Sequence, residues 1–149
     1  METDYSLYVH IPYCIKKCDY CDFFSVGNNC RVPDEYLSAL KSEIAVRTLD
    51  YGVVSWNTVY IGGGTPTTLE AWQLQKLIQK LQDSFDVTYV KEFCVEAGRP
   101  DSITLEKLRV LKEMGVERIS INPQTMNDKT LKLIGRQHTV KQTIDAFEL

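Results

Sequence analysis

Short apolar runs alternate with longer amphipathic segments along the whole chain. After each run, apolar residues recur every three or four positions, which is the spacing of one face of an α-helix. Strands that alternate with helices form a parallel sheet with the helices packed outside it, so the sequence predicts an α/β fold. The expected strands are 7–11, 58–61, 92–96 and 116–121. Three expected helices have their apolar positions within 37–44, 74–81 and 105–114. Two short helices are expected after the last strand, over 127–134 and 139–149.

Local signals predict where the helices begin and end. Pro33 and Asp34 open the first helix. Thr67 and Glu70 have the spacing of a capping box, so we expect them to precede the second helix as its cap. Gly115 follows the third helix and is a suitable C-terminal cap.

Three cysteines lie in one short loop after the first expected strand. Cys14, Cys18 and Cys21 have the spacing C-x3-C-x2-C, and Pro12 ends the strand just before them. A cluster of four irons and four sulfides normally takes four cysteine ligands. With three, one iron keeps an open position, which a substrate or cofactor needs in order to bind the metal. The loop therefore predicts an open iron–sulfur site.

Two other interpretations of this loop stay open. A structural zinc site would need a fourth ligand, which His10 offers, although zinc ligands usually come as two pairs with a longer spacer. A disulfide would leave one of the three thiols over. Of the remaining cysteines, Cys94 lies in a strand pattern and is expected to be buried, whereas Cys30 lies in an expected loop and has no assigned role.

A second loop contains three consecutive glycines. The run Gly62–Gly64 follows the strand 58–61 and precedes Thr65 and Pro66. Glycine lets a backbone approach a ligand closely because it has no Cβ. The run is not a phosphate loop, since neither Gly-Lys-Ser/Thr nor G-x-G-x-x-G is present. A tight strand-to-helix turn is the simpler alternative.

Each of the four expected strands ends at residues that can carry chemistry. The cysteine loop follows the first strand, the glycine loop follows the second, Glu96 ends the third and Gln124 follows the fourth. In a β/α barrel the active site lies at the carboxyl ends of the strands. We therefore expect these four segments to meet in one pocket.

The composition of the 149-residue chain is that of a globular protein, with 44% hydrophobic and 25% charged residues. A net charge of −3 argues against non-specific binding to nucleic acid. No apolar run is long enough to span a bilayer, and the start of the chain has no secretory signal. Five cysteines at uneven spacing fit a reducing compartment, so we expect a cytoplasmic protein.

Together these segments resemble the radical S-adenosylmethionine (SAM) enzymes, in the branch of the oxygen-independent coproporphyrinogen III oxidases. The resemblance covers nearly the whole chain from Leu7 onward. It implies a partial (β/α) barrel with about four of the family's six β/α units, so that residues 1–149 are the N-terminal portion of a radical SAM core domain. The matching segments are Tyr8-Val-His-Ile-Pro-Tyr-Cys14 with the three-cysteine spacing, Gly62-Gly-Gly-Thr-Pro66, Val95-Glu-Ala-Gly-Arg-Pro-Asp101, Arg118-Ile-Ser-Ile-Asn-Pro-Gln124 and Ile134-Gly-Arg136.

The resemblance also implies roles for the matching residues. Cys14, Cys18 and Cys21 would bind a [4Fe-4S] cluster whose unique iron is chelated by the amino and carboxylate groups of SAM. The implied reaction is the oxidative decarboxylation of coproporphyrinogen III to protoporphyrinogen IX, with an electron donor such as flavodoxin or ferredoxin, and Arg99 would hold a propionate of this tetrapyrrole. The residues that would contact SAM are Tyr8, Tyr20, Gly63, Gly64, Thr65 and Glu96, with Gln124 and Arg136 at a second SAM.

The chain departs from the bacterial oxidases in two ways. Phe23 occupies a position where those enzymes carry another cysteine, and the sequence Cys-Asp-Phe is similar to the haem-chaperone relatives instead. A haem chaperone that binds SAM and the cluster without oxidase chemistry is therefore the alternative function. The chain also ends after four strands, so we expect the fourth strand to leave an open sheet edge that favours association between chains.

Overall fold

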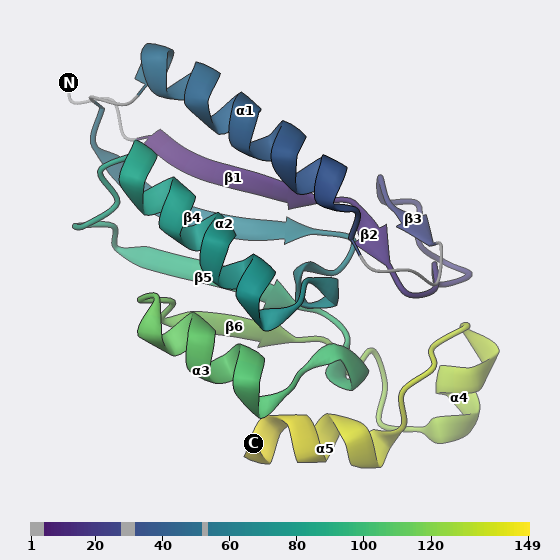
Figure 1. Cartoon of the computed structure of the whole chain (residues 1–149). Helices are drawn as coiled ribbons and strands as arrows, with labels where there is room; N and C mark the ends of the chain where they lie inside the picture. The colour runs from purple at the N-terminus through teal and green to yellow at the C-terminus, as the bar shows by residue number, and fades with distance from the viewer. Residues whose placement is uncertain (1–4, 28–31, 52–53) are drawn as a thin grey trace.

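The fold is built on a four-stranded parallel sheet (Figure 1). The computed structural model describes residues 5–27, 32–51 and 54–149, so Cys30 lies outside the described residues. The predicted α/β fold with a parallel sheet is confirmed, and each expected strand is present. In spatial order the strands are β1 (Tyr5–Ile11), β4 (Trp56–Gly63), β5 (Glu92–Ala97) and β6 (Arg118–Ile121).

Three helices connect neighbouring strands and lie on one face of the sheet (Figure 1). They are α1 (Asp34–Tyr51), α2 (Ala71–Ser84) and α3 (Leu105–Glu113). Two shorter helices, α4 (Asp128–Leu133) and α5 (Val140–Glu148), follow β6. Within the described ranges, none of the helices has the length and hydropathy needed to cross a membrane.

The core lies between the sheet and the three covering helices. Ile11, Ile61 and Val95 are fully buried on the strands, and Leu74 and Leu81 are fully buried on α2. Burial of each such side chain stabilises the fold by about 1.5–3 kcal/mol. Since the strand residues lie close to the carboxyl ends of their strands, this packing also fixes where the following loops begin.

The opposite face of the sheet carries polar and aromatic side chains. The hydroxyl of Thr58 donates to Ser6 Oγ at 2.9 Å, and Arg118 pairs with Glu92 at 2.9 Å, in each case between neighbouring strands. In a closed barrel, residues alternate between the outside and the interior along each strand, and this face would line the interior. Strand β6 lies at the edge of the sheet, as expected. Association of chains through that edge stays a prediction.

The beginning of α2 differs from the prediction. Thr67 lies in a short 3-10 turn (Pro66–Thr68), and its hydroxyl hydrogen-bonds to Ser102 Oγ at 2.5 Å. Glu70 is the N-cap residue, and its backbone N–H donates to Gln73 Oε1 at 2.9 Å. The capping box predicted for Thr67 and Glu70 was therefore wrong, because Thr67 is buried in a tertiary contact and the box is formed one turn later.

Gly115 ends α3 as predicted. Its φ of +81° is the left-handed conformation that glycine adopts without strain. The N–H of Val116 donates to the carbonyl of Leu111 at 2.9 Å, as in a Schellman motif. Because this bond makes Val116 part of the helix end, β6 begins at Arg118 and not at Val116.

Candidate functional site

The carboxyl ends of the four strands open onto one cavity of about 470 Å³. This volume is within the range of ligand pockets, about 300–1,000 Å³. The structure brings all the residues predicted to bind the cluster or SAM to this cavity, while their roles as ligands stay predictions. These residues are Tyr8, Cys14, Cys18, Tyr20, Cys21, Gly63, Gly64, Thr65, Glu96, Gln124 and Arg136.

The cysteine loop is closed at its base by a short ladder. Strand β2 (Tyr13–Cys14) pairs in parallel with β3 (Val26–Gly27), which joins the two ends of the loop. Cys14 is buried, Cys18 and Cys21 are partly exposed, and all three are free thiols. Because none of the three is in a disulfide, all three sulfurs are available as metal ligands.

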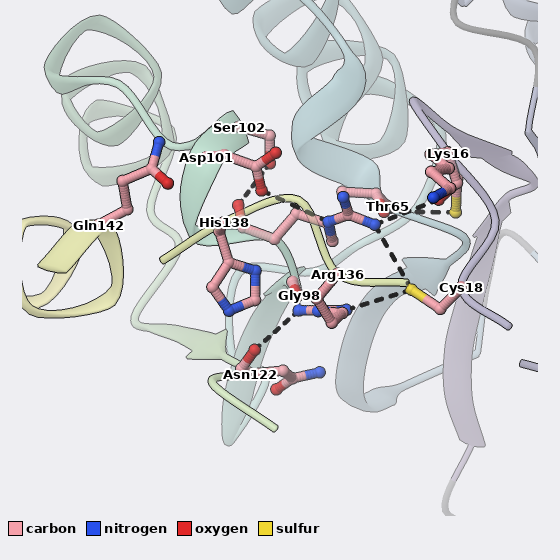
Figure 2. Close-up of polar contacts among 12 residues, drawn as sticks. Lys16, Cys18, Thr65, Gly98, Asp101, Ser102, Asn122, Arg136, His138 and Gln142 are labelled. Atoms are coloured by element: carbon pink, nitrogen blue, oxygen red, sulfur yellow. Dashed lines mark hydrogen bonds and ion pairs between the residues drawn. The ribbon is translucent and has the colours of Figure 1, made fainter. Parts of the chain in front are cut away.

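Two arginines from different parts of the chain donate to the sulfur of Cys18. Nη1 of Arg99 lies 3.5 Å from Cys18 Sγ, and Nη1 of Arg136 lies 3.6 Å from it. Arg136 also donates from Nη2 to the carbonyls of Gly98 at 2.7 Å and Asn122 at 2.9 Å (Figure 2). Since Gly98 follows β5 and Asn122 follows β6, Arg136 joins the cysteine loop to both strand ends.

These arginines place positive charge beside the cysteine loop, out of contact with water. Arg99 is 3% exposed and Arg136 is 7% exposed. In the described part of the chain, Arg99 pairs with Asp101 at 3.4 Å, while Nη2 of Arg99 and Nε of Arg136 are buried without a hydrogen-bond partner. A buried charge is costly unless it is paired. The site therefore suits an anionic occupant, and three thiolates around an iron–sulfur cluster fit that requirement.

The contacts of His10 do not favour the zinc alternative. Its Nε2–H donates to the carbonyl of Phe24 at 2.9 Å, so Nδ1 is the acceptor for the hydroxyl of Tyr8, also at 2.9 Å. Both nitrogens are thus engaged away from the cysteines. Over residues 5–27, 32–51 and 54–149, no group of three or more His, Cys, Asp or Glu side chains is spaced to hold a single metal ion. This spacing is compatible with a cluster, because cysteines that bind three different irons lie further apart than the ligands of a single ion.

The three glycines were predicted to form a loop after residue 61, but Gly62 and Gly63 are the last residues of β4 and only Gly64 follows the strand. Gly63 and Gly64 are required by the protein's own backbone. Gly63 has a φ of +122°, and a Cβ there would lie 2.6 Å from the carbonyl oxygen of Ile11. A Cβ on Gly64 would lie 2.7 Å from the carbonyl oxygen of Tyr13 and 3.0 Å from the sulfur of Cys14. The closest neighbours of these glycines are therefore β1 and the start of the cysteine loop, where the sequence led us to expect a ligand.

Thr65 connects the glycine loop to the first cysteine. Its side chain is 1% exposed, and its hydroxyl donates to the carbonyl of Gly64 at 2.7 Å. The same oxygen lies 3.5 Å from the sulfur of Cys14. The end of β4 and the cysteine loop are thus held in contact by a buried polar group as well as by the glycines.

Aromatic rings and a carboxylate form another wall of the cavity. Tyr8 on β1 stacks against Tyr60 on β4 with their ring centroids 6.0 Å apart. Burial, and after it the charge of Glu96, raises the pKa of both tyrosines, so their hydroxyl groups stay protonated at neutral pH. Burial also raises the pKa of Tyr20, which borders the cavity from the cysteine loop. Glu96 is suited to accept hydrogen bonds from an ammonium or hydroxyl group of a ligand.

Gln124 borders the cavity in an unusual backbone conformation. Its φ is +64°. Among the non-glycine residues that the structure describes, no other has a positive φ. Such a conformation costs on the order of 1–3 kcal/mol and persists where the surrounding structure fixes it. Nothing in the sequence predicted this conformation.

Several cavity residues were not predicted from the sequence. Tyr60 could have been predicted from the sequence, because it lies two residues before Gly62 on β4 and residues two apart on a strand share one face of the sheet. Asn122 follows the end of β6 directly, as Gln124 does. The cavity residues to which the sequence assigned no ligand are Phe23, Tyr60, Gly98 and Asn122.

Arg99 borders the cavity, but its guanidinium contacts the cysteine loop. Nε lies 3.4 Å from Asp101 Oδ1, and Nη1 donates to the carbonyl of Lys16 at 3.1 Å and to Cys18 Sγ. Nη2 has no partner, but a bidentate pair with a propionate would also need an N–H of Nε or Nη1, and those atoms already donate to Asp101, Lys16 and Cys18. The geometry therefore favours a structural contact with the loop over the propionate role expected from the resemblance.

Comparison with known proteins identifies the family. The model of the radical SAM superfamily matches residues 8–149. The solved structure of the coproporphyrinogen III oxidase HemN from Escherichia coli, a radical SAM enzyme, superposes with a TM-score of 0.90 at 30% sequence identity, covering 99% of this chain and 34% of that one. The parallel sheet is thus consistent with a partial radical SAM barrel of the HemN type.

Two curated relatives from Bacillus subtilis (strain 168) are more similar in sequence. The oxygen-independent coproporphyrinogen-III oxidase-like protein HemZ is 41% identical, over 100% of this chain and 31% of its own length. The heme chaperone HemW is 43% identical, over 96% of this chain and 38% of its own length. The chain therefore spans about a third of the length of the curated relatives it matches. With residues 8–149 matched by the family model, the chain belongs to the radical SAM superfamily, whose members bind a [4Fe-4S] cluster and SAM.

Proposed function

We propose that this chain provides the cluster-binding and SAM-binding part of a HemN-like enzyme that acts on a tetrapyrrole. The observation that carries the proposal is one cavity of about 470 Å³ bordered by three cysteines, the glycine loop and Glu96. The proposed reaction is the oxidative decarboxylation of two propionates of coproporphyrinogen III, giving protoporphyrinogen IX. Support comes from the structural likeness to HemN and from the similarity to HemZ along the whole chain.

In this proposal the three cysteines hold the cluster and leave one iron free. Cys14, Cys18 and Cys21 would each hold one iron, and the fourth iron would be left open for the amino and carboxylate groups of SAM. When bound, the cluster would supply one-electron reductive cleavage of SAM, and the resulting carbon radical would remove hydrogen from a propionate side chain. The substrate radical would then release CO2 and give one electron back to the cluster, so that SAM is the net oxidant. Thr65 and the arginines on Cys18 fix the sulfurs in place before any ligand binds.

Other residues of the cavity orient SAM. Glu96 accepts hydrogen bonds from its ammonium or hydroxyl groups. Tyr8 supplies aromatic surface beside SAM, and Tyr20 packs against the adenine. The backbone of the glycine loop approaches SAM from the end of β4. Gln124 and Arg136, which follow β6, are proposed to contact a second SAM.

A haem chaperone is the second candidate function, and Phe23 is the observation that favours it. This side chain borders the cavity and is 52% exposed, at the position where the bacterial oxidases carry a further cysteine. The heme chaperone HemW is 43% identical to this chain. Under this alternative, the same cavity binds the cluster and SAM, and a haem replaces coproporphyrinogen as the tetrapyrrole.

The partners follow from the same proposal. The enzyme would take electrons from a small donor protein such as flavodoxin or ferredoxin, and it would work in the cytoplasm. Neither function requires nucleic acid, in keeping with the net charge of −3. The electron donor is needed for the oxidase reaction and for any cleavage of SAM.

Product analysis separates the two functions. Because the chain spans about a third of its relatives, the test uses a version extended by two further β/α units and a C-terminal region. This protein, with its cluster reconstituted, is incubated without oxygen with coproporphyrinogen III, SAM and a reductant, and the porphyrins are separated after oxidation. The oxidase proposal predicts protoporphyrin together with methionine from SAM, and both should be lost in Cys18→Ala. Retention of coproporphyrin together with tight binding of haem would favour the chaperone. If neither product nor haem binding appears while cluster and SAM are bound, both candidates fail.

A further inference from the structure

Arg99 differs from the other cavity residues in the direction of its contacts. Its N–H groups reach Asp101, the carbonyl of Lys16 and the sulfur of Cys18. The first contact lies two residues away in the sequence, whereas the other two are in the cysteine loop. Arg99 is therefore bound to the loop from the end of β5, and its side chain is only 4% exposed.

The three cysteines have different surroundings. Cys18 Sγ faces two guanidinium groups, from Arg99 at 3.5 Å and from Arg136 at 3.6 Å. Cys14 Sγ faces the neutral hydroxyl of Thr65 at 3.5 Å. Positive charge is thus concentrated on one of the three expected cluster ligands.

A cation that donates a hydrogen bond to a ligand sulfur stabilises the form of a cluster that carries more negative charge. Reduction adds one electron to the cluster, so such a contact raises the reduction potential. Hydrogen bonds to the sulfurs, net charge and solvent exposure are the features that set the potentials of iron–sulfur clusters. Arg99 combines all three, since it donates to sulfur, is charged and is shielded from water.

We propose that Arg99 is a positioning residue that raises the reduction potential of the cluster through its contacts with Cys18 and the loop carbonyl of Lys16. The inference rests on the cluster binding proposed above. Asp101 then has a defined part as well, because its carboxylate lies 3.4 Å from Arg99 Nε and partly neutralises the charge beside Cys18. Removing Arg99 and removing Asp101 should therefore move the potential in opposite directions.

The test is a redox titration of the reconstituted protein without SAM, followed by the EPR signal of the reduced cluster and normalised to iron content. Arg99→Gln should lower the ratio of reduced to oxidised cluster at a fixed potential about tenfold, which is about 59 mV for a one-electron couple. Arg99→Lys keeps the charge but loses the planar arrangement of N–H donors. Its ratio of reduced to oxidised cluster should therefore lie between that of the wild type and that of Arg99→Gln. Asp101→Asn should raise the ratio.

Arg118→Gln is the matched control, and thermal unfolding of each variant checks that the variant is folded. Arg118→Gln removes a charge from an exposed ion pair with Glu92, away from the cysteine loop, and should change the ratio less than twofold. If Arg99→Gln does not assemble a cluster, Arg99→Lys and Asp101→Asn still test the opposite signs. Ratios unchanged from wild type, or shifted in the same direction by Asp101→Asn and the Arg99 variants, would overturn the proposal. Failure of the wild-type protein to bind a cluster would instead refute the proposed function.

Discussion

The guanidinium of Arg136 lies 3.6 Å from the sulfur of Cys18, although 118 positions separate the two residues in the sequence. The same guanidinium donates to the carbonyls that follow β5 and β6. One buried side chain thus connects the first loop of the site to its third and fourth strand ends. This contact helps to hold a long loop, whose Tyr20, Phe23 and Phe24 side chains are largely exposed, at a fixed place over the sheet.

Removal of Arg136 should therefore destabilise the protein even without a cluster. Arg136→Ala leaves the carbonyls of Gly98 and Asn122 without their charged donor, and hydrogen bonds of this kind contribute about 1.5–3 kcal/mol each. Because the variant also removes the cost of burying the guanidinium charge, we expect a net loss of roughly 2–4 kcal/mol in the free energy of unfolding of the apoprotein, measured by urea denaturation. The exposed Arg118→Ala should cost less than about 1 kcal/mol. Equal losses for the two variants would show that the buried contacts of Arg136 carry no special weight.

Glu96 is expected to act on SAM and not on the cluster. Glu96→Gln removes the charge from a hydrogen-bond acceptor, so SAM affinity should fall by a factor of about 10–150, equivalent to roughly 1.5–3 kcal/mol. The iron content should stay that of the wild type. Isothermal titration of the reconstituted protein with SAM gives the affinity. Glu92→Gln, on the same strand but paired with Arg118, is the control and should leave it unchanged. A normal affinity in Glu96→Gln would remove this residue from the site.

Gly63 is expected to be essential for the fold itself. Gly63→Val combines a φ of +122° with a Cβ only 2.6 Å from the carbonyl oxygen of Ile11, so either β1 or β4 must move. We expect a loss of at least about 3 kcal/mol, or failure to fold, by circular dichroism and urea denaturation. Gly115→Ala also places a side chain at positive φ, but with nothing within 4 Å, and should cost only about 1 kcal/mol. A mild effect of Gly63→Val would contradict the close contact with β1.

Protonation of His138 is expected to oppose folding. The side chain is 2% exposed, and burial, followed by the charge of Arg136, lowers its pKa below the ordinary value of 6.5. Just below pH 6.5 the unfolded chain therefore binds a proton that the folded chain does not, so stability falls as pH falls from 6.5 through the lowered pKa. Urea denaturation of the apoprotein between about pH 7.5 and 5.5 should show a steeper loss for wild type than for His138→Gln. Parallel pH profiles would contradict this role.

The strands and the convergence of the site were predictable because they depend on local pattern and connectivity. Apolar runs predicted β1, β4, β5 and β6, and the alternation with helices predicted that these strands are parallel. Once the strands are parallel, their carboxyl ends must lie at one edge of the sheet. That geometry is sufficient to bring Cys14, Glu96 and Gln124 to one cavity without knowledge of any side-chain contact.

The contacts within the site were not predictable, because they join residues far apart in the sequence through side-chain geometry. The pairing of Arg99 with Cys18 spans 81 positions and depends on how the guanidinium leaves the end of β5. The glycine loop shows a different limit. Its composition predicted close approach of the backbone, but only the folded structure shows that the approaching group is Ile11 and the start of the cysteine loop. The spacing of Thr67 and Glu70 likewise predicts a cap, because a local pattern carries no information on the tertiary contact of Thr67 with Ser102.

We propose that Cys14, Cys18 and Cys21 hold a [4Fe-4S] cluster with one iron open to SAM. The most direct measurement is EPR spectroscopy of the reduced, anaerobically reconstituted protein, recorded with and without SAM beside its iron content. We expect about four irons per chain and a spectrum that changes when SAM is added. Alanine at any one of the three cysteines should abolish the signal, whereas Cys94→Ala should retain it. Stoichiometric zinc without iron, or a cluster whose spectrum is indifferent to SAM, would contradict the account.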